Sequence, residues 1–102
     1  MDLDALRAEH GEVLVLESMG YRVVVRMPTE AEFDAFMAGV TTPAKGAGAV
    51  KVLFRRVVVW PTRAEVDAMM RAKPGLGVTL GNKVADWAGL GAEVEAEKSE
   101  PS

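Results

Sequence analysis

The chain has 102 residues and a mass of 10.9 kDa, which suffices for one compact domain and excludes a multi-domain enzyme. It contains no cysteine, so disulfide scaffolds, thiolate zinc sites and cysteine nucleophiles are excluded as well. Residues 93–102 hold four Glu and one Lys and account for the whole formal net charge of −3. Because the rest of the chain is neutral and lacks the basic footprint of nucleic-acid binding, we expect no nucleic-acid partner.

The composition is that of a folded domain outside membranes. Apolar residues make up 49% of the chain and charged residues 26%, which is close to average globular usage. No apolar run approaches the length of a membrane span, and residues 1–4 lack the basic and apolar parts of a secretory leader. We expect a soluble cytoplasmic protein with a single globular domain over residues 1–92, followed by an acidic disordered tail over residues 93–102.

The N-terminal third predicts a short helix and a β-hairpin. Residues 3–10 are compatible with one or two helical turns behind an Asp2 cap. Residues 12–17 and 21–26 are rich in Val and Leu, and Gly20 between them allows the positive φ of a tight turn. Since both faces of these strands carry branched apolar residues, one face should contact the protein's own helices. The other face needs cover from a partner or from a second copy.

A first amphipathic helix is predicted after Pro28. Thr29 and Glu32 have the spacing of a capping box, and Gly39 is a reasonable terminator. The apolar stripe of this helix has helical spacing and consists of Phe33, Phe36, Met37 and Val40. Residues 41–48, with one proline and two glycines, are predicted to form the most flexible internal connection.

The C-terminal half predicts three further helices. Residues 49–57 have helical spacing and run into a β-branched segment that stops at Pro61, which favours a helix with an extended exit. Residues 61–70 repeat the pattern of residues 28–37 at seven of ten positions, including the cap, and predict a helix that ends at Pro74. A last helix is predicted over residues 77–88. The fold class expected is α+β and mainly helical, with an N-terminal β-hairpin followed by three or four short helices.

Reactive groups are scarce in this sequence. His10 is the single histidine, and the serines lie in a turn and in the tail, so neither a metal site nor a serine nucleophile is expected. Glu32 and Glu65 recur with nearby aspartates, but helix capping explains their positions. The glycine-rich segments 46–48 and 75–77 lack the order of a phosphate-binding loop. We therefore expect no enzymatic activity and no cofactor.

Two features are candidates for partner binding. Lys51, Arg55 and Arg56 would form a basic patch on the helix over residues 49–57, while Arg22 and Arg26 lie on one face of the second strand. This pattern is compatible either with a solvated polar face or with docking against an acidic helical partner. The second feature is a pool of methionine and aromatic side chains, which suits either a core or an adaptable binding surface. Its members are Phe36, Met37, Trp60, Met69 and Met70.

The order of these signals resembles the small tail assembly chaperones of long-tailed bacteriophages and related prophages. The resemblance spans residues 21–90 and is carried by short motifs. These are Arg26-Met27-Pro28-Thr29 with Ala31, Phe33 and Phe36; the run from Leu53 to Pro61; Pro74-Gly75-Leu76; and Leu80-Gly81-Asn82 with Ala88-Gly89-Leu90. Met27 between the arginine and the proline, and Thr62 where an aspartate is common, depart from the family pattern.

The resemblance implies a non-enzymatic protein of the host cytoplasm. It would bind the tape measure protein, with the tail tube protein as a second candidate partner, and would keep the long helical client soluble until tube subunits polymerise. The residues we expect to contact the client are Phe36, Met37, Phe54, Arg55, Arg56, Met69 and Met70. One alternative is a small neck or tail component that assembles as a homo-oligomeric ring through the hairpin edge. A small enzyme is a further alternative, which would need a pocket with a strongly shifted carboxylate at Glu32 or Glu65.

Overall fold

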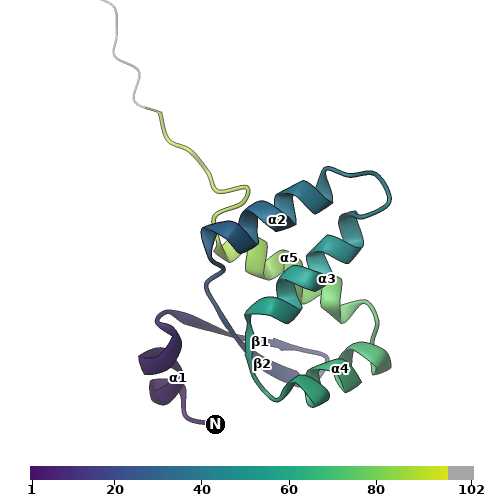
Figure 1. Cartoon of the computed structure of the whole chain (residues 1–102). Helices are drawn as coiled ribbons and strands as arrows, with labels where there is room; N and C mark the ends of the chain where they lie inside the picture. Colours follow the sequence, from purple (N-terminus) through teal and green to yellow (C-terminus); the bar gives the residue numbers. More distant parts are fainter. Residues whose placement is uncertain (97–102) are drawn as a thin grey trace, which may run out of the picture.

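The computed structural model describes residues 1–96 and combines a small antiparallel sheet with five helices in that range (Figure 1). The fold is α+β and mainly helical, as predicted. The elements in chain order are α1 (Leu3–His10), β1 (Val13–Ser18), β2 (Tyr21–Arg26), α2 (Glu30–Val40), α3 (Gly46–Val57), β3 (Val58–Trp60), α4 (Arg63–Ala72) and α5 (Leu76–Trp87). Residues 92–96 have no regular secondary structure, and the rest of the predicted tail lies outside the described residues.

The hairpin forms where the sequence predicts it. β1 and β2 pair antiparallel with Val15 opposite Val24 and Ser18 opposite Tyr21. Met19 and Gly20 form the turn, and both have positive φ values, 52° and 81°. Two consecutive residues of this kind match the twist of the flanking strands in a two-residue hairpin.

The sheet has a third strand, where the sequence predicted only an extended exit from the helix. β3 begins directly after α3 and pairs antiparallel with β2, with Val58 opposite Val25 and Trp60 opposite Val24. The central strand β2 thus hydrogen-bonds on both sides, in the order β1-β2-β3. An isolated two-stranded ribbon is marginally stable, and the added strand supplies part of the missing support.

Helix α3 begins earlier than predicted and lies at the centre of the helical layer. It starts at Gly46, so Gly46 and Gly48 are helical and do not belong to a flexible connection. It packs against α2 and against α5, which crosses behind it (Figure 1). The α3–α5 contact depends on Gly81, because a Cβ built there would lie 2.6 Å from the carbonyl oxygen of Val50.

The core lies between one face of the sheet and the helices. Phe54, Leu53 and Val57 of α3 are almost fully buried in it, together with Val84 of α5. On the opposite face of the sheet, Val24 is also buried, and α1 contacts β1. Within residues 1–96, no helix is both long enough and apolar enough to cross a lipid bilayer.

Candidate functional site

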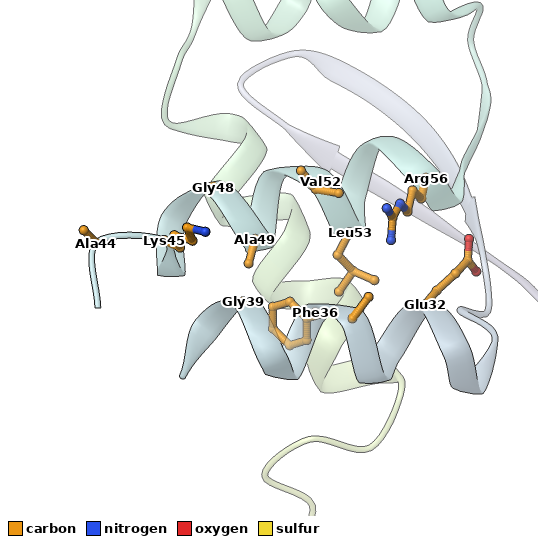
Figure 2. A pocket seen from close by; sticks show the side chains of 11 residues that line it. Glu32, Phe36, Gly39, Ala44, Lys45, Gly48, Ala49, Val52, Leu53 and Arg56 are labelled. Carbon is orange, nitrogen blue, oxygen red and sulfur yellow. The ribbon is translucent and has the colours of Figure 1, made fainter. Parts of the chain in front are cut away.

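An open groove of about 460 Å³ runs between α2 and α3 (Figure 2). The two helices run antiparallel, and the side chains of Phe36 and Leu53 form its apolar floor. Val52 lies at the rim with 46% of its surface exposed, which makes it one of the most exposed large apolar residues in the described part of the chain. The remaining lining residues at its centre are small, namely Ala35, Gly39, Gly48 and Ala49.

Small side chains on both helices explain the groove. A Cβ built on Gly39 would lie only 2.5 Å from the Cβ of Ala49, so the two backbones approach closely at this crossing. Nothing lies within 4 Å of a Cβ built on Gly48, which therefore leaves open space above the crossing. The contact between Gly39 and Ala49 sets the distance between the helices, and the absence of a side chain at Gly48 leaves a volume that is open to solvent.

One end of the groove is fixed by an ion pair. Arg26, the last residue of β2, donates from Nη1 and Nη2 to the two carboxylate oxygens of Glu32 at 2.7 and 2.8 Å. Both side chains are mostly buried, with 24% and 19% of their surface exposed. Glu32 also accepts a hydrogen bond from the backbone N–H of Thr29, whose hydroxyl accepts from the N–H of Glu32. The predicted capping box is therefore present and is reinforced from the sheet.

These contacts fix the protonation state of Glu32. The hydrogen bonds from Arg26, aided by the backbone N–H of Thr29 and opposed by burial, lower its pKa from 4.5 to about 2. Of the two carboxylates named for the enzymatic alternative, Glu32 lines the groove and Glu65 is exposed on α4. A general acid near neutral pH needs a raised pKa. The shift has the opposite direction, and both oxygens are already engaged by Arg26.

Two cationic side chains that line the groove, those of Lys45 and Arg56, have no carboxylate partner within residues 1–96. Lys45 precedes the first turn of α3, and Arg56 lies in the last turn, so they stand at opposite ends of the groove (Figure 2). Within residues 1–96, neither side chain makes an ion pair or a hydrogen bond. The groove is therefore apolar along its length, with one unpaired positive charge at each end.

Comparison with known proteins places the chain in a family. Residues 6–97 match the model of a family described as a domain of unknown function (DUF6848). The chain belongs to the DUF6848 family. No curated protein is similar enough to this chain to count as a match.

A solved structure has the same fold as this DUF6848 domain. It is the structure of the uncharacterised protein rbstp2171 from Bacillus stearothermophilus, with a TM-score of 0.78 and 18% sequence identity. The similarity covers 94% of this chain and 100% of that chain. At this identity the similarity concerns the fold alone.

The predicted basic patch of the DUF6848 domain is divided between two faces of α3. Successive helical residues are rotated by about 100°, so Arg55 and Arg56 point in different directions. Arg56 lines the α2–α3 groove, whereas Lys51 and Arg55 line a second pocket of about 280 Å³ beside α4. There Arg55 forms an ion pair with Asp67 at 3.1 Å. The two strand arginines are also paired, Arg22 with a carboxylate of β1 at 3.5 Å and Arg26 with Glu32.

The predicted apolar contact residues lie mainly in the core. Phe54, Met69 and Phe36 are buried, and only Phe36 reaches the floor of the groove. Met37 and Met70 are half-buried against the core. Five other residues of the groove were not among the predicted contact residues, although the small residues at 35 and 39 have helical spacing and were a usable signal. The five residues are Ala35, Gly39, Lys45, Gly48 and Val52.

Proposed function

We propose that this protein is a non-catalytic tail assembly chaperone of a bacteriophage or prophage. In the host cytoplasm it binds helical segments of the tape measure protein and keeps that chain soluble until tail tube subunits assemble around it. The observation that carries the proposal is the open apolar groove between α2 and α3, with Phe36 and Leu53 as floor and Val52 exposed at the rim. The sequence resemblance over residues 21–90 supports the identity of the client.

A groove of this form fits an amphipathic helix. Such a helix presents apolar side chains at positions i, i+3, i+4 and i+7, which is the periodicity of a long helical client. Each fully buried apolar side chain contributes about 1.5–3 kcal/mol, and the ordering of two partners removes much of this gain. A few anchors therefore give weak binding at one groove. Several copies along one long client would together hold it, while each copy could still be displaced by tube subunits.

The test compares groove variants with a surface control in a pull-down with co-expressed tape measure protein. Val52→Asp places a charge on the apolar rim and should reduce client capture strongly. Gly48→Leu fills the open space with a side chain and should block binding, while helix propensity stabilises the fold by about 0.5–1 kcal/mol. Met19→Asp is the control, because Met19 is 64% exposed at the hairpin turn, away from the groove.

The variants distinguish loss of client binding from loss of folding and from a general effect of surface charge. Loss of capture in Gly48→Leu cannot be attributed to unfolding if this variant melts at or above the wild-type temperature. Undiminished capture by both Val52→Asp and Gly48→Leu would refute the groove as the client site. Capture reduced equally in Met19→Asp would show that the assay responds to general surface charge.

One observation favours the structural alternative. β1 hydrogen-bonds to β2 on one side only, so its other edge offers unpaired backbone groups to another strand. A ring component would use this edge to join copies of the chain. Size-exclusion chromatography and negative-stain microscopy of the protein without its client separate the two proposals. A ring component should form a stable ring by itself, whereas a chaperone should show no such ring.

A further inference from the structure

We infer that the α2–α3 groove selects helices bearing two acidic side chains eleven positions apart on the face that carries the apolar anchors. This inference rests on the proposed function only in assuming that the groove receives a helix. It adds the chemistry and the spacing of the partner sequence. The observation behind it is the placement of Lys45 and Arg56 at the two ends of an otherwise apolar groove.

The charges at the groove are not balanced within the described part of the chain. Glu32 is the one carboxylate that lines the groove, and Arg26 binds both of its oxygens. An acidic side chain of the partner at that end would therefore meet the unpaired Arg56, with Glu32 already neutralised. Lys45 gives the same preference at the other end. Charge complementarity of this kind determines which partners bind and how fast they associate, more than how tightly.

Helix geometry fixes the spacing. Lys45 and Arg56 are eleven positions apart, which corresponds to about 16 Å along α3. Eleven residues also complete about three turns, so positions i and i+11 lie on nearly the same face of any helix. A partner helix that lies along the groove thus reaches both cations with acidic residues at i and i+11. Its apolar side chains at i+4 and i+7 then point to the floor formed by Phe36 and Leu53.

The second basic pocket does not offer the same arrangement. Lys51 and Arg55 are only one turn apart, and Arg55 is already paired with Asp67. That pocket is also on another face of α3, beside α4, and it lacks an apolar floor of comparable length. The spacing of eleven is therefore specific to the α2–α3 groove.

The experiment uses the full-length protein and three fluorescein-labelled helical peptides that share the same apolar residues. The first carries glutamates eleven positions apart on the apolar face, the second carries lysines at these positions, and the third has the glutamates on opposite faces. Fluorescence anisotropy at low salt should show the first peptide binding about fivefold more tightly than the third, since exposed ion pairs are individually weak. The second peptide should bind more weakly still, because its lysines meet like charges. High salt should remove most of these differences.

Charge exchange provides the decisive comparison. The variant Lys45→Glu/Arg56→Glu should prefer the lysine peptide, and the neutral variant Lys45→Gln/Arg56→Gln should bind all three peptides alike. Equal binding of the three peptides by the wild-type protein would overturn the spacing and charge inference while leaving a helix-binding groove intact. Absence of binding by every peptide would overturn the groove itself and with it the proposed function. If the doubly acidic variant fails to fold, the neutral variant still tests whether the two cations cause the preference for the first peptide.

Discussion

Arg26 and Glu32 form a bidentate ion pair that joins the sheet to the helical layer. The same guanidinium donates from Nη2 to the carbonyl oxygen of Arg56 at 3.0 Å, so one side chain from β2 holds the start of α2 and the end of α3. This is also the end of the groove at which Arg56 is unpaired. The ion pair therefore sets both the relative position of the two groove helices and the charge that a partner meets there.

The repeated helix start gives a matched test of this ion pair. Thr62 caps α4 by accepting from the N–H of Glu65 at 3.3 Å, but Glu65 has no counterpart of Arg26 in the described structure. We expect Glu32→Gln to lower the free energy of unfolding by about 1–3 kcal/mol, because it leaves a mostly buried guanidinium without its partner. Glu65→Gln should cost less than about 0.5 kcal/mol. Urea denaturation measures both, and equal losses would contradict the special role of Arg26.

The lowered pKa of Glu32 predicts acid sensitivity. In the folded protein this pKa is about 2, whereas 4.5 is its ordinary value, so the unfolded chain binds the proton more readily. The stabilisation is complete above about pH 4.5 and is lost as the pH falls toward 2. The melting temperature of the wild-type protein should therefore fall across this window. In Glu32→Gln the fall should be smaller, and identical pH profiles would show that other carboxylates dominate.

Two glycines should respond in opposite ways to the same substitution. Gly81→Ala would place a methyl group 2.5 Å from Cγ1 of Val50 and against its carbonyl oxygen, which forces α3 and α5 apart. We expect a loss of about 1–3 kcal/mol, as is typical of overpacking. Gly48→Ala meets nothing within 4 Å and should gain about 0.5–1 kcal/mol from helix propensity. Thermal unfolding would contradict this packing if both variants shifted in the same direction.

The division of the basic patch predicts that neighbouring arginines act differently. Arg56→Gln should weaken binding of an acidic helical peptide, because Arg56 lines the groove. Arg55→Gln should leave that binding unchanged and remove only an exposed ion pair with Asp67, at a cost of less than about 1 kcal/mol. Anisotropy titrations and urea denaturation of both variants check this, and weaker binding in Arg55→Gln would place the binding surface on the α4 side instead.

Local signals in the sequence were sufficient to predict most helices and strands. Thr29 and Glu32 predicted the start of α2, and Gly20 predicted the hairpin turn, because capping and turn chemistry depend on a few adjacent residues. The apolar spacing of residues 49–57 likewise predicted most of α3. The predicted start of α3 was too late, because Gly46 and Gly48 disfavour a helix locally. Only the packing of α3 against α2 and α5 compensates for this low helix propensity.

The sequence by itself thus determined the order and type of the elements other than β3, the caps of α2 and α4, and the charge balance of the chain. Only the tertiary structure decided that β3 pairs with β2, that Arg26 reaches Glu32 and that Arg55 and Arg56 serve different surfaces. The groove belongs to the second group as well, because it depends on the close approach of Gly39 to Ala49 across two helices and on the open space at Gly48. Local propensities act over a few residues along the chain, whereas a groove depends on the volume left between side chains that are distant in sequence.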